Sequence, residues 1–175
     1  MQFQLTEEQL MIQAAARDFA QNDCKPGVIE RDEHQKFPAE QVKKLGELGF
    51  LGMMVDPKYG GAGLDSVSYV LAMTEIAKVD ASAAVIMSVN NSLVCAGMEK
   101  YCSEEQKMKY LPKLASGEFL GCFGLTEPDS GSDPGSMITH IKDAGDHMIL
   151  NGAKMWISNS PYADIAVVWA KDEAG

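Results

Sequence analysis

The sequence is short of positive charge and of long apolar runs, and each shortage excludes a class of function. Its 15 lysines and arginines face 25 aspartates and glutamates, which gives a formal net charge of −10 at pH 7. No basic patch is long enough to neutralise a phosphate backbone, so we expect no nucleic-acid partner. No stretch approaches about 18 uninterrupted apolar residues, so we expect no membrane-spanning segment.

The sequence also lacks the cysteine spacing of a disulfide framework or a zinc site. It contains no C-x-x-C pair, and three of its four cysteines lie in or beside apolar segments. The three histidines have no metal-ligand spacing either. We therefore predict reduced, partly buried thiols and no metal centre. The residues concerned are Cys24, Cys95, Cys102, Cys122, His34, His140 and His147.

A secretory signal is another missing feature. Residues 1–8 read MQFQLTEE, which has neither a basic region nor an apolar region of the kind that such a signal needs. This pattern predicts a cytoplasmic protein or the mature form of an organelle protein, in the mitochondrial matrix if the source is a eukaryote.

What the sequence does contain begins with helices, over about its first two thirds. Thr6-Glu-Glu-Gln9 and Ser103-Glu-Glu-Gln106 are capping boxes. The run 81–98 is apolar on nearly all sides, which predicts a central buried helix. Pro112 is expected to kink or end the last helix, which Gly117 closes. Helices are thus expected over residues 6–24, 38–49, 66–77, 81–98 and 103–117.

The period of the apolar residues changes after Glu118, where strands are expected. Residues 119–126 and 165–169 read as short strands. Residues 147–150 and 153–158 read as a hairpin around a type I′ turn at Asn151-Gly152. The predicted fold class is therefore α+β. An all-helical N-terminal domain, residues 1–117, precedes the start of an incomplete antiparallel β-barrel-like domain, residues 118–175. Because its sheet would be left with open edges, we expect the chain to be the front portion of a longer protein.

The stretch GCFGLTEPDSGSDPG, residues 121–135, is the candidate functional loop. Its glycines, serines and threonine offer backbone N–H groups and short hydroxyls that suit an oxyanion or the polar edge of a heterocycle. It matches neither G-x-G-x-x-G nor G-x-x-x-x-G-K-[ST], and it lacks the ligand pattern of a calcium loop. Composition alone leaves two readings open, a loop for a polar ligand and the commoner plain turn.

The order of residues carries a resemblance to a known family. Gly124-Leu-Thr-Glu-Pro-Asp-Ser-Gly-Ser-Asp133, followed by Met155-Trp-Ile-Ser-Asn159, resembles the flavin-binding half of the acyl-CoA dehydrogenases. Family members carry G-L-T-E-x-x-x-G-[ST]-D and then W-I-[ST]-N about two dozen residues later. The segments 5–9, 59–63 and 103–112 are also similar, so the resemblance covers all 175 residues.

The resemblance implies an FAD-dependent oxidoreductase of fatty acid β-oxidation. It would convert an acyl-CoA thioester to a trans-2-enoyl-CoA and pass the electrons to an electron-transferring flavoprotein. The family has a third, C-terminal helical domain, which builds homotetramers and supplies the catalytic base in most members. By this resemblance the domain is absent here, no residue of the chain is the catalytic base, and the 175-residue chain alone is inactive.

The resemblance also assigns site residues. Phe123, Leu125 and Thr126 match positions at the flavin ring, and Trp156 matches an aromatic packed on it. Ser158 matches a hydroxyl near flavin N5, with Ile157 beside it. Gly131 and Ser132 match the loop at the cofactor's pyrophosphate and the substrate's pantetheine arm. The cofactor-binding set is Phe123, Leu125, Thr126, Gly131, Ser132, Trp156, Ile157 and Ser158; the substrate-binding set is Ser132 and Ser88. On spacing alone, a plain sheet-core role for Trp156 is the alternative.

The buried helix gives a hint about the acyl group. In the family this helix helps to wall the acyl pocket, and relatives acting on glutaryl-CoA carry an arginine where this sequence has Ala84. Because a buried carboxylate needs a cation, the absence of charge over residues 81–98 predicts a neutral acyl group. The run 88–93 resembles short-chain, butyryl-type members. Alternatively, Asn90 and Asn91 only satisfy backbone groups. The competing functions are an acyl-CoA oxidase and a non-catalytic helical interaction module.

Overall fold

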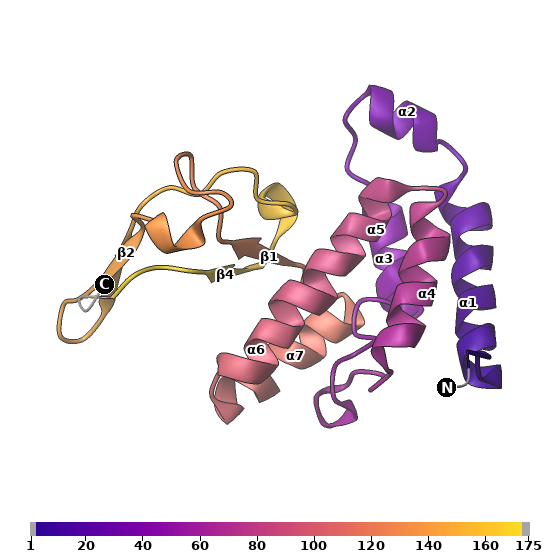
Figure 1. The fold of residues 1–175 in the computed structure, drawn as a ribbon, viewed down its shortest axis with the longest axis horizontal. Coiled ribbons are helices and arrows are strands. Elements are labelled where there is room, and N and C mark those ends of the chain that lie inside the picture. The colour runs from indigo at the N-terminus through magenta and orange to yellow at the C-terminus, as the bar shows by residue number, and fades with distance from the viewer. Residues whose placement is uncertain (1–2, 173–175) are drawn as a thin grey trace.

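The computed structural model describes residues 3–172 and places a helical bundle beside a smaller β part. Figure 1 shows the helices gathered around α1 at one end, with β2 and the C-terminus at the other. The α-helices are α1 (Glu7–Phe19), α2 (Val28–Glu33), α3 (Ala39–Glu47), α4 (Ser66–Ala77), α5 (Ala81–Ser88), α6 (Ala96–Tyr101) and α7 (Glu104–Ser116). Two π-helical segments, η1 (Ala20–Cys24) and η3 (Val89–Cys95), continue α1 and α5, and short 3₁₀ turns lie at Pro57–Tyr59, Pro134–Ser136 and Ser160–Tyr162. The strands are β1 (Gly121–Gly124), β2 (His140–Asp143), β3 (Met148–Asn151) and β4 (Ile165–Val168).

The helix boundaries follow the capping residues of the sequence. Both predicted capping boxes form, with Thr6 before α1 and Ser103 before α7, so these helix starts are confirmed. The α7 helix runs through Pro112 and ends at Gly117, whose φ of 78° is in the left-handed region. The short helix α2, in which no residue is buried, was not predicted from the sequence.

The helical core consists of two clusters that share one long helix. The first lies between α1, α3, α4 and α5, and the second between η3, α6 and α7. Phe123, Ile165 and Val167 pack against the second cluster, which joins the β part to the bundle. The shared helix, Ala81–Tyr101, meets the length and composition of a membrane span, which the apolar-run criterion did not anticipate. More than half of its most apolar window is nonetheless buried inside the protein.

Glu75 is a buried carboxylate of the bundle that is paired with several donors. Glu75 of α4 accepts hydrogen bonds from Gln13 and Arg17 of α1 and from Lys78. The bonds from Arg17 and Lys78 lower the pKa of Glu75 to about 2. The cysteines behave as expected for free thiols: Cys24, Cys95 and Cys122 are buried, and burial raises the pKa of Cys24 and Cys95 to about 12.

Asn90 and Asn91 of η3 connect the long helix to its surroundings. The Asn90 side chain donates to the carbonyls of Leu51 and Leu114 and accepts from the N–H of Gly121, at 2.9, 3.1 and 3.0 Å. The Asn91 side chain accepts from the N–H of Met53 and donates to the carbonyl of Phe50. The reading that these asparagines satisfy backbone groups is confirmed. Both are fully buried, and Asn90 ties the first residue of β1 to the helix.

The β part confirms the α+β class, with two small sheets and no closed barrel among the described residues. The expected antiparallel pairing holds for β2 and β3, where His140 lies opposite Asn151. The strands β1 and β4 instead pair in parallel, with Gly121 opposite Ile165. Both β1 and β4 fall within the segments predicted to be strands.

The predicted hairpin around Asn151-Gly152 is wrong. The partner of β3 is β2, and the turn between them contains Gly145 at φ 94°. Gly152 has a φ of 151°, which does not fit a type I′ turn. Residues 153–158 form no strand, because the N–H of Met155 bonds to the carbonyl of Thr126 rather than to β3. A tertiary contact has overridden the local turn signal.

Replacing Asn90 by leucine tests the role of its amide. Asn90→Leu leaves the carbonyls of Leu51 and Leu114 and the N–H of Gly121 without this partner. We expect the free energy of unfolding, measured by urea denaturation, to fall by about 3 kcal/mol. In the control Ser92→Ala, only a hydroxyl bond to Ser88 in the same helix is lost, and the expected change is within about 0.5 kcal/mol. Equal effects of the two substitutions would contradict this prediction.

Two glycine substitutions test how closely β1 packs on the long helix. A Cβ on Gly121 would lie 2.5 Å from Cγ1 of Val94, whose χ1 is stiff. Gly121→Ala should therefore lower the free energy of unfolding by about 1–3 kcal/mol. In α6, a Cβ on Gly97 would meet no atom within 4 Å, so Gly97→Ala should raise stability by about 0.5–1 kcal/mol. Urea midpoints that move in the same direction would refute the packing argument.

Candidate functional site

The two motif segments of the sequence lie side by side in the structure. The N–H of Met155 donates to the carbonyl of Thr126 at 2.9 Å, and the side chain of Asn159 donates to the carbonyl of Gly121 at 3.0 Å. These bonds hold the segment from Met155 to Asn159 along the end of β1 and the residues after it. The structure thus brings Leu125 and Thr126 next to the turn that carries Trp156, Ile157 and Ser158.

Trp156 is the most unusual residue of this region. Its φ of 58° lies in the left-handed region, and 85% of its surface is exposed. A bulky residue in that conformation is strained by about 1–3 kcal/mol, and such strain persists where the surroundings impose it. Sheet-core packing, the alternative reading for Trp156, is wrong because the residue is neither buried nor in a strand. Ile157 is half-buried and Ser158 exposed.

Phe123 has a different environment. It is half-buried on β1 and packs edge-on against Trp169, with ring centroids 6.2 Å apart. Trp169 in turn contacts Tyr101 of α6 edge-on at 6.0 Å. Three aromatic rings therefore connect the end of the long helix to β1, which makes Phe123 a packing residue as well as a candidate site residue.

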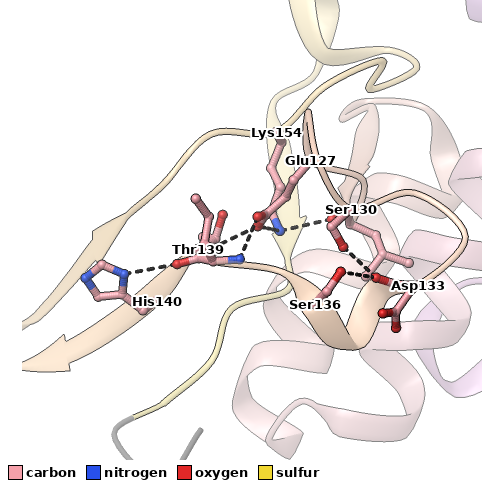
Figure 2. A network of polar contacts seen from close by, with 9 residues as sticks. Glu127, Ser130, Asp133, Ser136, Thr139, His140 and Lys154 are labelled. Carbon is pink, nitrogen blue, oxygen red and sulfur yellow. Dashed lines mark hydrogen bonds and ion pairs between the residues drawn. The ribbon is translucent and has the colours of Figure 1, made fainter.

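Glu127 and Lys154 form a buried ion pair behind this region (Figure 2). Their side chains are 2% and 12% exposed, and Lys154 Nζ lies 2.7 Å from Glu127 Oε1. Lys154 also donates to the carbonyl of Leu125, and Glu127 accepts the N–H groups of Ile138 and Thr139. Burial by itself would raise the pKa of the Glu127 carboxyl. The hydrogen bonds from Lys154, Thr139 and Ile138 outweigh it and lower that pKa from 4.5 to about 2.

The loop after Glu127 is shaped by its own hydroxyls. Ser130 Oγ and Ser136 Oγ both donate to the carbonyl of Asp133 (Figure 2). Gly131 and Ser132 are exposed at its surface. Within residues 3–172, no hydrogen bond joins these two residues to the other predicted site residues.

The remaining candidates lie on α5. Ser88 is half-buried at the end of that helix, and its carbonyl accepts a bond from Ser92 Oγ. Ala84 is buried in the first core cluster. A cleft of about 840 Å³ lies between α2, the start of α5 and the turn that follows Trp156. Val85 and Ser158 are among its lining residues, which also include Phe37 and Tyr162, stacked 3.9 Å apart.

Sequence reasoning missed the residues that hold this site together. Lys154 and Thr139 were not singled out, and Glu127 and Asn159 were noted only as parts of the two motifs. One signal was available: Lys154 is the single charged residue in the apolar run 152–157. A lone charge in such a run is either exposed or paired, and here it is paired.

Two family models match the chain, and they follow one another along it. The model described as "Acyl-CoA dehydrogenase, N-terminal domain" matches residues 6–118, and "Acyl-CoA dehydrogenase, middle domain" matches residues 122–175. A "Short-chain specific acyl-CoA dehydrogenase, mitochondrial" of Homo sapiens is 45% identical over 170 residues. A short-chain-specific acyl-CoA dehydrogenase of Clostridium acetobutylicum is 44% identical over 170 residues. Each alignment covers 97% of this chain, which spans 41% and 45% of the respective relatives.

Solved structures agree in fold over almost the whole chain. A glutaryl-CoA dehydrogenase of Mycobacterium smegmatis, solved in complex with FADH2, matches with a TM-score of 0.94 at 44% identity. The match covers 98% of this chain and 44% of that one. A chain in a structure described as the electron transferring flavoprotein of Acidaminococcus fermentans matches with a TM-score of 0.94 at 43% identity, covering 97% of this chain and 45% of that one.

The low pKa of Glu127 predicts a pH dependence of stability. Because the folded state lowers this pKa, the ionised carboxylate stabilises the fold fully above pH 4.5, and this contribution is lost as the pH falls to about 2. The difference in unfolding free energy between the wild-type protein and Glu127→Gln should therefore shrink over that interval. Urea denaturation at a series of pH values measures it, and a constant difference would show that the carboxylate is not held in its ionised form.

Proposed function

The chain belongs to the acyl-CoA dehydrogenase family, and from this premise we propose that the intact protein is an FAD-dependent acyl-CoA dehydrogenase. The proposed reaction is α,β-dehydrogenation of an acyl-CoA thioester to a trans-2-enoyl-CoA. FAD would supply the acceptor for the hydride that leaves the β-carbon of the substrate. The proposed acceptor of the electrons is an electron-transferring flavoprotein, the class of protein named in one of the similar structures.

The meeting of the two motif segments is the observation that carries this proposal. A flavin needs flat apolar contact on its ring face and hydrogen-bond donors at its polar edge. The exposed indole of Trp156 offers the first, and the hydroxyl and N–H of Thr126 offer the second. No hydrogen bond from the Thr126 N–H is found within the described residues 3–172, so this donor is free for a ligand. The residues present therefore fit the cofactor.

We assign the contacts as follows. Leu125, Thr126, Trp156 and Ile157 would face the flavin ring, with Phe123 beneath them and the Ser158 hydroxyl as a donor near N5. Gly131 and Ser132, on the exposed loop, would meet the pyrophosphate, and Ser132 together with Ser88 would contact the substrate.

The catalytic base is not assigned to any described residue. Glu127 is the carboxylate of the motif, but three donors occupy its oxygens and its pKa is about 2. A carboxylate held ionised in this way is a weak proton acceptor at neutral pH. Its geometry instead supports a structural task.

A short-chain, neutral acyl group is the proposed substrate class. Two observations support it: the relatives named above are short-chain specific, and the environment of Ala84 is apolar core. An arginine at that position would be needed to pair with a carboxylate at the end of the acyl chain. The similar glutaryl-CoA dehydrogenase makes glutaryl-CoA the substrate to test against.

We further propose that residues 1–117 form a helical domain and residues 118–175 a β domain. The intact protein is proposed to assemble as a homotetramer. The competing function is that of an acyl-CoA oxidase, which would use the same cofactor and substrate. It would differ in the rapid reaction of its reduced flavin with oxygen.

Anaerobic reduction by two CoA thioesters tests the proposed function. The intact protein should show an oxidised flavin spectrum, and butyryl-CoA should bleach it at least about tenfold faster than glutaryl-CoA, since residues 81–98 offer no cation for the second carboxylate. The absence of any flavin spectrum would refute the cofactor and favour the non-catalytic module. Faster bleaching by glutaryl-CoA would refute the neutral acyl group. Rapid reoxidation by air would identify the oxidase instead.

A further inference from the structure

The buried pair behind the candidate site has no part in the contacts assigned above. We propose that the Glu127–Lys154 ion pair is a positioning device, which holds the Leu125–Thr126 peptide and the Trp156 turn in the arrangement that contacts FAD. This inference rests on the proposed function, because it explains how the chain shapes the site that would receive the cofactor.

Lys154 fixes the first half of this arrangement. Its ammonium donates to the carbonyl of Leu125 at 3.0 Å and to Glu127 at 2.7 Å, and the N–H of the next residue donates to the carbonyl of Thr126. The described chain contains no cis peptide bond, so the N–H of Thr126 points away from the Leu125 carbonyl with which it shares a peptide. By holding that carbonyl, Lys154 sets the direction of the free Thr126 donor.

Glu127 fixes the second half. One carboxylate oxygen accepts the N–H of Ile138 at 2.7 Å, and the other accepts the N–H of Thr139 at 3.0 Å (Figure 2). The backbone of Glu127 also pairs in both directions with that of Ser130. A single side chain thus closes the base of loop 128–137, which carries Gly131 and Ser132.

The strain at Trp156 shows that something must hold this turn. The indole is exposed, so burial of its own surface does not offset the left-handed backbone. The bonds that flank it do: Met155 to Thr126 on one side and Asn159 to Gly121 on the other. Lys154, immediately before Met155, anchors the first of these to the carboxylate of Glu127.

The ionic nature of the pair also favours positioning over stability. Both side chains are largely removed from water. Desolvating two charged groups costs more free energy than burying two apolar residues of similar size in the same space. Charged groups in return give directional, short hydrogen bonds to several segments at once. If the pair served only stability, neutral residues would replace it equally well. If it positions the site, neutral residues can restore stability but not FAD binding, and the experiment distinguishes these two cases.

Four variants of the intact protein separate positioning from stability. Glu127→Gln and Lys154→Met each remove one charge, and the double variant leaves no buried unpaired charge. The control is Glu75→Gln in α4, where a carboxylate of similar burial, 5% exposed, accepts bonds from Gln13, Arg17 and Lys78. Two properties are measured: the thermal midpoint, and the FAD dissociation constant of the apoprotein at a temperature where each variant is folded.

A third measurement does not need the cofactor. In a background with Trp169→Phe and with phenylalanine in place of any tryptophan outside residues 1–175, time-resolved fluorescence anisotropy without FAD reports the local motion of Trp156. We expect this motion to increase in the single and double variants and not in the control.

The double variant is the decisive one. It should regain part of the thermal midpoint lost by the single variants, while its FAD affinity stays at least about tenfold below that of the wild-type protein. The control should lower the midpoint and leave the FAD affinity unchanged. Recovery of affinity together with the midpoint would overturn the inference, and so would unchanged Trp156 motion in every variant. If the wild-type protein binds no FAD, the proposed function fails, and the anisotropy still decides whether the pair positions Trp156.

Discussion

The hydrogen bonds of two buried asparagines are the constraint on which the rest of this structure depends. Asn90 and Asn91 reach from the π-helical segment of the long helix to the loop at residues 50–53, the end of α7 and the start of β1. The partners in these bonds are backbone groups of buried residues, where a missing hydrogen bond is costly. Because Gly121 receives one of these bonds, the first strand of the β part begins at a place fixed by the core of the helical part.

The candidate site is built outward from that strand. Residues 125–127 follow β1, and the segment 154–159 is bonded to them through Lys154, Met155 and Asn159. The side chains proposed to contact a ligand are exposed or half-buried, while Glu127 and Asn159, which help to hold them, are buried. The buried residues thus form a rigid support for site residues that make few contacts of their own within the described chain.

The sequence predicts the helical part well because its signals are local. Capping boxes and apolar periodicity depend on residues three or four positions apart, and they place α1 and α7 correctly. The β part is different. The pairing of β2 with β3 and the turn at Trp156 depend on contacts such as Lys154 to Glu127, which are separated by 27 residues. The motif order identified which residues would meet, but a turn signal at Asn151-Gly152 could not reveal that a buried ammonium draws the following segment away.

The π-helical segment η3 has a consequence for the evolution of the chain. A π turn contains more residues than an α turn, so residues after Val89–Cys95 emerge rotated relative to an uninterrupted α-helix. This offset lets one helix present Met87 to the first cluster and Met98 to the second. Loss of a single residue there would turn everything downstream by about 100° around the axis. The spacing across this helix is therefore under tighter constraint than the identity of most of its side chains, and insertions or deletions within it should be rarer among related chains than substitutions.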